Sequence, residues 1–159
     1  MFGFSSGTQP AHGNNWGMYM LAEQMVYRER AKDDPAQQGL VGFLRFEGAP
    51  PDRNLFQFGV DGGLVYKGLI PSRDWDTFAV AGSYLKMSRD LQRAQRDANA
   101  VVPGFFTVSD YEAVFEASYK AQVTAWWTLQ PSIQRVFHPG GSEAIPDAWV
   151  AIVMSSLRF

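Results

Sequence analysis

Hydrophobic and polar residues alternate with a period of two along most of the chain. Between Tyr111 and Val123, apolar or aromatic side chains occupy every second position, with mostly charged or polar residues between them. Successive side chains of a strand point to opposite faces, so this pattern predicts a strand. A helix over the same residues would place Glu112 and Glu116 at a spacing where like charges repel.

Six further segments show the same alternation, so the chain is predicted to form seven strands. The predicted strands are residues 16–27, 39–49, 56–66, 78–84, 111–123, 125–137 and 148–159. Most exceed the roughly five or six residues usual in globular proteins, and their lengths suit strands that cross a membrane at a tilt. The facing of the first strand is ambiguous in its sequence. Pro131 has no backbone N–H to donate, which predicts a bulge or a local break in strand pairing.

The connections between the strands sort into short and long ones. Short turns are predicted at 50–53, at 71–76 and around Thr124, and longer polar connections at 28–38, 88–108 and 138–146. Residues 88–100 are expected to form a short helix, and residues 1–15 read as a loop-like leader rich in Gly, Ser and Asn. Arg73, Asp74 and Asp76 are interpreted as a cluster that stabilises its own turn rather than a binding site.

Composition excludes several classes of protein. The 159 residues carry a formal net charge of −2, which argues against a nucleic-acid binder. The chain has no cysteine, and only His12 and His138 offer imidazole, so we predict neither a disulfide framework nor a metal site nor a cofactor. No stretch approaches the roughly 20 consecutive apolar residues of a membrane helix.

Three features favour a membrane environment over that of a soluble β-domain. Aromatic residues lie near the predicted strand ends, as in interfacial girdles; these are Tyr111, Trp126, Trp127, Phe137, Trp149 and Phe159. The polar faces carry charges inside long strands, which suits a wet lumen better than a dry core. The chain also ends on a strand. The predicted fold class is therefore all-β, an antiparallel transmembrane β-barrel.

From about Asn15 to its end the chain resembles the carbohydrate-selective porin family (OprB-type) of Gram-negative outer membranes. The stretches that carry the resemblance are NWGMYMLAEQMVYRE, APPDRNLFQFGVDGGLVYKGLIPSRDWDTFAVA, YEAVFEASYKAQVTAWWTLQPSIQRVFHPGG and PDAWVAIVMSSLRF. The resemblance implies a barrel of roughly sixteen strands with an aqueous channel. Residues 16–159 are then expected to supply about seven carboxyl-terminal strands of that porin-type barrel.

The resemblance also implies passive diffusion of glucose and other small sugars, with no enzymatic step. The lumen and substrate-contact candidates are Arg45, Glu47, Asp61, Lys67, Glu112, Glu116, Lys120, Gln122, Thr128, Gln130, Ser132, Gln134 and Arg158. Their amides and hydroxyls offer hydrogen bonds to a neutral sugar without one dominant charge. Opposite charges on neighbouring strands are expected to pair and to keep the net charge of the wall near zero.

Partners and location follow from the same resemblance. Small sugars, outer-membrane lipid and the outer-membrane assembly machinery are the expected partners, and a homo-oligomer of the parent porin stays open. Phe159, with Leu157 and Val153 on its face, resembles the signal that this machinery reads. Residues 1–15 lack the segments of a secretory signal, so the signal peptide is expected to lie outside this chain. The connections at 28–38, 71–76 and Thr124 are expected to be periplasmic and the others external.

Several alternatives stay open at the level of sequence. One is a soluble β-sandwich that binds carbohydrate, and another is a small self-contained outer-membrane barrel. Glu112 and Glu116 also offer the paired carboxylates of a glycosidase, although carboxylates are ordinary in a wet lumen. Gly62, Gly63 and Gly68 do not form a phosphate loop and are predicted to relieve packing or curvature.

Overall fold

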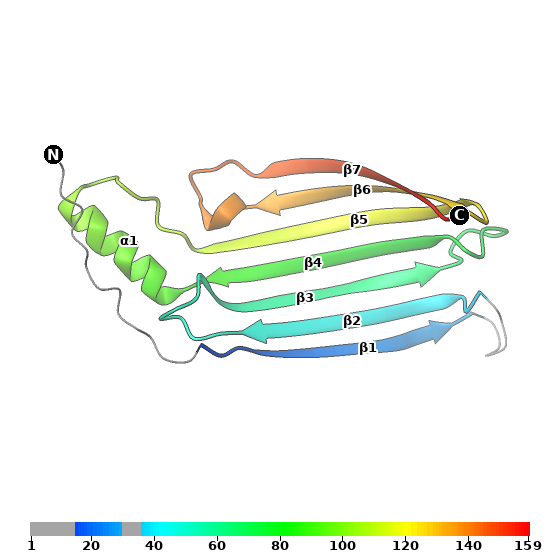
Figure 1. Cartoon of the computed structure of the whole chain (residues 1–159), viewed down its shortest axis with the longest axis horizontal. Coiled ribbons are helices and arrows are strands. Elements are labelled where there is room, and N and C mark those ends of the chain that lie inside the picture. Colours follow the sequence, from blue (N-terminus) through cyan, green and yellow to red (C-terminus); the bar gives the residue numbers. More distant parts are fainter. Residues whose placement is uncertain (1–14, 30–35) are drawn as a thin grey trace.

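The computed structural model describes residues 15–29 and 36–159, which form one antiparallel sheet. The strands are β1 (Met18–Arg28), β2 (Gly39–Gly48), β3 (Phe56–Lys67), β4 (Thr77–Met87), β5 (Tyr111–Thr124), β6 (Trp127–Phe137) and β7 (Ala148–Leu157). Helix α1 (Arg89–Val101) joins β4 to β5, and a 3-10 turn, η1 (Pro139–Gly141), lies between β6 and β7. Each strand pairs with its neighbour in the chain, in the order β1 to β7 (Figure 1). The seven predicted strands are therefore confirmed.

The boundaries differ from the sequence-based ones by a few residues. β6 begins at Trp127 rather than at residue 125, and β7 ends at Leu157 rather than at Phe159. Residues 125 and 126 form the turn after β5. The backbone N–H of Arg158 still donates to the carbonyl of Trp126 at 2.8 Å, so pairing continues just past the assigned end of β7.

Pro131 breaks the pairing of β6 on one side only. β5 and β6 keep one register on either side of it, with Ser118 opposite Ser132 and Ala121 opposite Leu129, and the pairing is interrupted between these points. On the other side Pro131 stays aligned with Val153 of β7. The predicted local break is confirmed and no bulge accompanies it, because a missing N–H removes one ladder bond without adding a residue.

Helix α1 begins at a buried cap. The Ser88 hydroxyl accepts hydrogen bonds from the backbone N–H groups of Asp90 (3.2 Å) and Leu91 (3.3 Å), and its side chain also donates to the carbonyl of Pro51. The Ser88 N–H donates to the carbonyl of Leu55 at 2.8 Å. The predicted helix is therefore confirmed, and its first turn is tied to the β2–β3 connection.

The connections gather at two opposite ends of the sheet (Figure 1). We call the end that carries α1, η1 and residues 49–55 the helix end. The end that carries residues 68–76, residues 125–126 and the carboxyl terminus is the turn end. The long connections at 88–110 and 138–147 thus share one end, as the alternation of strand direction predicts.

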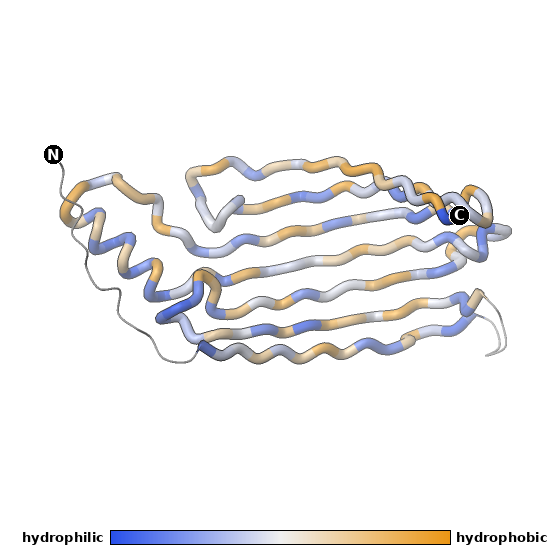
Figure 2. Tube along the Cα trace, viewed as in Figure 1, coloured by the Kyte–Doolittle hydropathy of each residue, from blue (hydrophilic) through white to orange (hydrophobic). Residues whose placement is uncertain are grey.

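The sheet forms a single layer without a conventional core. Among the described residues, Ala36 and Met87 are the buried hydrophobic ones, whereas large side chains such as Phe115 (60% exposed) and Val153 (69%) stay open. Helix α1 extends beyond the strand ends and covers neither face (Figure 1). Figure 2 shows hydrophilic and hydrophobic residues succeeding one another along each strand. A β-sandwich needs a second sheet packed on one face, and the described residues provide none, so that alternative is wrong.

No helix in the described part of the chain has the length and apolarity to cross a membrane.

Gly39 is expected to tolerate no side chain. Its φ is +145°, and a Cβ there would lie 2.2 Å from the carbonyl oxygen of Tyr27, on the neighbouring strand. We expect Gly39→Ala to lower the free energy of unfolding by about 1–3 kcal/mol, because the strained backbone and the clash both oppose β1–β2 pairing. Urea unfolding of the refolded protein in detergent measures the effect. Gly42→Ala is the matched control, since its Cβ would meet side-chain atoms of Val26 and Leu64 at 3.4 and 3.5 Å.

Candidate functional site

The strand registers sort the side chains into two faces, because directly paired residues point to the same side of a sheet. We call one the polar face; its charged, amide and hydroxyl side chains are Tyr19, Glu23, Arg28, Arg45, Glu47, Asp61, Lys67, Thr77, Ser83, Glu112, Glu116, Ser118, Lys120, Gln122, Thr128, Gln130, Ser132, Gln134 and Ser156. All lumen candidates that lie within strands fall on this face. Arg158 follows β7 with the same parity as Ser156 and lines a hollow together with it.

Glu23 belongs to the polar face and was missed by the sequence reasoning. In β1 both parities carry large apolar residues, so the alternation does not choose between them. The structure pairs Glu23 with Phe43 and Leu21 with Arg45, which settles the facing of the strand. The facing of Glu23 therefore follows from the pairing of β1 with β2, and the sequence of β1 alone does not show it.

An ion pair crosses the middle of the polar face. Arg45 of β2 and Asp61 of β3 are directly paired residues, and Arg45 Nε lies 2.8 Å from Asp61 Oδ2. Glu47 Oε2 lies 4.0 Å from the same nitrogen. The expected pairing of opposite charges on neighbouring strands is confirmed here. The Arg45 side chain is 47% exposed, so this pair orients polar groups more than it stabilises the fold.

Glu112 and Glu116 point to different partners. Glu116 Oε2 accepts a 2.9 Å hydrogen bond from Nε2 of Gln134, which lies directly opposite on β6. Glu112 Oε2 accepts from the N–H of Gly140 in η1 at 2.6 Å. Their Cα atoms lie four strand residues, about 13 Å, apart, and the two carboxylates bond to separate groups on β6 and in η1 rather than to a shared partner. The arrangement fits two wall residues better than a catalytic pair.

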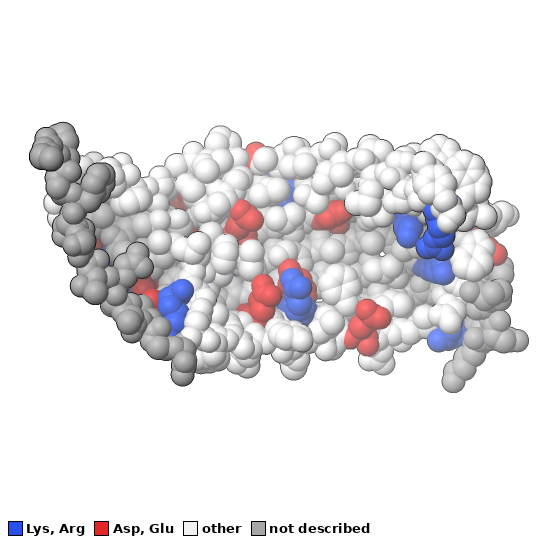
Figure 3. Space-filling model, viewed as in Figure 1, with Lys and Arg blue, Asp and Glu red and all other residues white. Residues whose placement is uncertain are grey.

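A polar hollow of about 470 Å³ lies on the polar face at the turn end. Its lining residues from β5, β6, β7 and the adjoining segments include Lys120, Gln122, Trp126, Thr128, Gln130, Ser156 and Arg158. On the face turned to the viewer in Figure 3, acidic side chains are spread along the sheet, and several basic side chains gather near the turn end. Lys67, Lys120 and Arg158 lie at the turn end of the polar face, which is therefore its most basic part.

The other face, which we call the apolar face, carries two rows of aromatic side chains. The row at the helix end contains Phe58, Tyr84, Tyr111, Phe137 and Trp149, and the row at the turn end contains Tyr27, Tyr66, Phe78, Tyr119 and Trp127. Neighbouring rings are close, with centroids 5.2 Å apart for Tyr84–Tyr111 and 6.5 Å for Tyr27–Tyr66. Along β5 the rows lie about 26 Å apart, close to the roughly 25 Å apolar band of a membrane barrel.

The predicted aromatic positions divide between these rows and the segments beyond them. Tyr111, Phe137 and Trp149 belong to the helix-end row and Trp127 to the turn-end row. Trp126 lies in the turn before β6, and Phe159 is fully exposed beyond β7. The rows also contain residues that the sequence did not single out, because their alignment depends on the register of every strand pair.

Two cations interrupt the apolar face, both in or beside the helix-end row. Arg135 donates to Oδ2 of Asp147 at 3.0 Å and lies over the rings of Phe137 and Trp149, at 5.4 and 5.2 Å from their centroids. Lys86 forms a short ion pair with Asp110. Each cation is matched by a carboxylate from a connection, which limits the cost of a charge on an apolar surface.

The predicted stabilisation of the β3–β4 turn is confirmed for two members of the cluster, Arg73 and Asp76. The Asp76 side chain is 3% exposed; its Oδ2 accepts from Arg73 Nε at 2.6 Å and from the Tyr119 hydroxyl, and its Oδ1 accepts from the Gln122 N–H at 2.8 Å. Burial raises the pKa of Asp76, but these hydrogen bonds offset it and hold that pKa below its ordinary value. One carboxylate thus ties the β3–β4 turn to β5.

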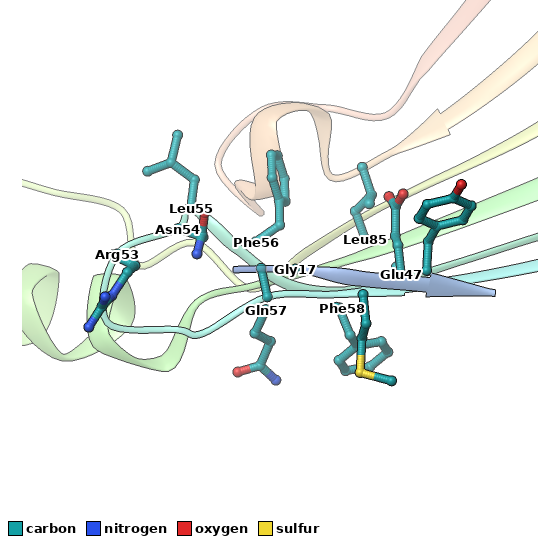
Figure 4. Close-up of a pocket in the computed structure, with 14 residues that line it drawn as sticks. Gly17, Glu47, Arg53, Asn54, Leu55, Phe56, Gln57, Phe58 and Leu85 are labelled. Atoms are coloured by element: carbon teal, nitrogen blue, oxygen red, sulfur yellow. The ribbon is translucent and has the colours of Figure 1, made fainter. Parts of the chain in front are cut away.

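A second, larger hollow of about 610 Å³ lies at the helix end, near the edge strand β1. In Figure 4, Glu47, Phe56 and Leu85 extend to one side of the backbone, whereas Gln57 and Phe58 extend to the other. The hollow therefore bends around the end of β3. Its polar groups do not converge, and we assign it no site.

At Gly63 of β3 the neighbouring strands leave no room for a side chain. A Cβ at Gly63 would lie 2.7 Å from the Phe43 ring and 2.7 Å from the Val80 carbonyl oxygen. Gly68, with φ +79°, packs in the turn against Gln38. These contacts agree with a packing role rather than a phosphate loop.

Comparison with known proteins finds one consistent group. A family model described as "Carbohydrate-selective porin, OprB family" matches residues 2–159. Porin B of Pseudomonas aeruginosa is 26% identical over 156 residues, covering 94% of this chain and 34% of Porin B. A putative porin, QuiX, of Acinetobacter baylyi is 26% identical over 159 residues, covering 93% of this chain and 35% of QuiX. The high-pH structure of Pseudomonas putida OprB superimposes with a TM-score of 0.83 at 26% identity, covering 92% of this chain and 36% of that one. The chain spans about a third of the length of these relatives.

Proposed function

Since the chain belongs to the OprB family of carbohydrate-selective porins, we propose that it forms part of the wall of a channel through which small sugars diffuse passively. The family implies the outer membrane of Gram-negative bacteria. The observation that carries the proposal is the contrast between the two faces of a single-layer sheet. One is apolar and bounded by two aromatic rows, and the other is polar and partly charged.

The apolar face is proposed to contact lipid. Between its aromatic rows β5 offers only Ala113, Phe115 and Ala117, and β6 offers Leu129, Pro131, Ile133 and Arg135. Arg135 is held beside the helix-end row by Asp147 and Trp149. Amphipathic rings at both boundaries match the girdles of outer-membrane barrels.

The polar face is proposed to line the lumen and to contact sugar through the candidates named from the sequence. Gln122, Thr128, Gln130, Ser132 and Gln134 provide amide and hydroxyl groups that replace water around a sugar hydroxyl. The Arg45–Asp61 pair offers polarity with little net charge. This chemistry needs no covalent step and no cofactor.

The sheet is proposed to be part of a larger closed barrel. Within the described residues, β1 and β7 each pair on one side only, and an open strand edge is costly in lipid. Seven strands over about a third of the relatives' length leave room for the further strands of a larger barrel, which the family resemblance puts at roughly sixteen in all. We place these strands in the carboxyl-terminal part of that barrel.

The turn end is proposed to face the periplasm, because porins have short periplasmic turns and longer outer loops. The connections of α1 and η1 would then face outward. Val153 and Leu157 lie on the apolar face of β7, and Phe159 follows it; we propose these residues as the signal that the assembly machinery reads. Homo-oligomerisation of the whole porin remains compatible with this arrangement.

Liposome swelling tests the sugar-channel function. We expect vesicles that hold the intact porin carrying this chain to swell in glucose several-fold faster than in N-methylglucamine, a cation of similar size, because a lumen of hydrogen-bonding groups favours the neutral sugar. Vesicles without protein are the control for leakage. Equal swelling rates in the two solutes would overturn the proposal.

A further inference from the structure

We propose that the hollow at the turn end of the polar face binds the anionic group of a sugar that carries a carboxylate or a phosphate. This inference rests on the proposed function, since it assigns a substrate class to one part of the channel wall. A neutral sugar needs hydrogen-bonding groups alone, whereas this hollow also contains the two cations Lys120 and Arg158.

Two other cations of the polar face are engaged elsewhere, and a third, Arg28 at the end of β1, does not line the hollow. Arg45 pairs with Asp61 at 2.8 Å, and the Lys67 ammonium lies over the Trp75 ring, 4.8 Å from its centroid. Lys120 and Arg158 make no ion pair with any side chain in the described ranges. Two unpaired cations that line one concave surface favour a negatively charged ligand.

Two carboxylates near the hollow already have partners. No Asp or Glu lines the hollow among the described residues. Asp76 is nearly buried and accepts from Arg73 and the Gln122 N–H, while Glu116, on the same face as Lys120, accepts from Gln134. Neither of these two carboxylates therefore competes with a ligand for Lys120.

The remaining lining groups fit the sugar part of such a ligand. Thr128, Gln130 and Ser156 place hydroxyl and amide groups on the floor formed by β6 and β7. Trp126 borders the hollow from the β5–β6 turn and is 55% exposed, so its ring offers an apolar surface to sugar C–H groups. The hollow, of about 470 Å³, has the size of a small-ligand site. In the proposed orientation it lies at the periplasmic mouth.

Block of single-channel current in planar bilayers tests the inference on the intact porin that carries this chain. Gluconate, glucose 6-phosphate, glucose and acetate are titrated separately. We expect an anionic sugar to block at a lower concentration than glucose or acetate does. Block by gluconate but not by glucose 6-phosphate would indicate a site for a carboxylate, and the reverse result a site for a phosphate. Block by both solutes would indicate a site that accepts either group. Block by glucose or acetate at the same concentration as the anionic sugars would overturn the inference.

Lys120→Met is the decisive variant, and Arg28→Met is its matched control. Both cations lie on the polar face at the turn end, but Arg28, at the end of β1, does not line the hollow and is not among the proposed sugar contacts. We expect Lys120→Met to raise the Kd of the anionic sugar about fivefold and to change glucose block less than about twofold, with Arg28→Met changing both less than about twofold. Arg158→Gln should resemble Lys120→Met, and Lys120→Arg should keep binding.

The inference and the proposed function fail differently. A protein that conducts and passes glucose, but whose Lys120→Met and Arg158→Gln variants bind the anionic sugar as the unmodified protein does, would overturn the inference alone. An equal loss in Arg28→Met would also overturn it, because a general change in lumen charge would then explain the effect. A protein that forms no channel would overturn the proposed function.

Discussion

Replacing Ala117 with arginine is expected to lower the free energy of unfolding by about 2–4 kcal/mol, as a charge does near the midplane of a lipid-facing barrel wall. Ala117 lies on the apolar face, paired with Val80 on one side and Ile133 on the other, between the two aromatic rows. A guanidinium there has no carboxylate at hand, unlike Arg135. Urea unfolding of the intact porin in lipid vesicles measures the loss.

The next residue of the same strand provides a matched control. Ser118 lies on the polar face, paired with Ala79 and Ser132, so Ser118→Arg places its charge in the proposed lumen. We expect that variant to unfold within about 1 kcal/mol of the unmodified protein, because exposed charges cost little. It should also change the ion selectivity of the channel. Equal destabilisation by the two substitutions would contradict the assignment of the faces.

Asp76→Ala is expected to destabilise the protein by about 3 kcal/mol, because it leaves a nearly buried set of donors without their shared acceptor. Arg73, the Tyr119 hydroxyl and the Gln122 N–H all donate to this carboxylate. The same unfolding assay measures the change. Asp52→Ala is the control: Asp52 is 42% exposed and pairs with the adjacent Arg53, so its removal should cost under about 1 kcal/mol.

The same carboxylate predicts a dependence on pH. Burial acts to raise the pKa of Asp76, but the hydrogen bonds from Tyr119, Gln122 and Arg73 outweigh it and lower that pKa below the ordinary value of 3.8. Its stabilising contribution is therefore complete above pH 3.8 and is lost as the pH falls through the lowered pKa. Unfolding midpoints between about pH 7 and pH 2 should fall more steeply for the unmodified protein than for Asp76→Asn. Parallel curves would contradict this role.

The alternation of hydrophobic and polar residues predicted the strands and most of their facing, which composition alone could not do. Because side chains of a strand repeat every two residues, the sequence specified which residues share a face within six of the seven strands, except where the irregularity between Phe56 and Phe58 puts these two side chains on opposite faces. It also placed the helix at 88–100 and the cluster around Asp76. It failed in β1, where both parities carry large apolar residues and the polar residues Glu23 and Gln24 fall on opposite faces.

Only the tertiary structure decided how the strands align. A shift of two residues between paired strands leaves every side chain on its face, so a period of two cannot specify the register. The register aligns Tyr66, Phe78 and Tyr119 into one aromatic row, and it brings Asp76 to Gln122. It also brings Lys120 and Arg158, from β5 and the end of the chain, into one hollow. The sequence thus determined the two faces of the wall, and hydrogen-bond pairing between strands decided where groups on each face meet.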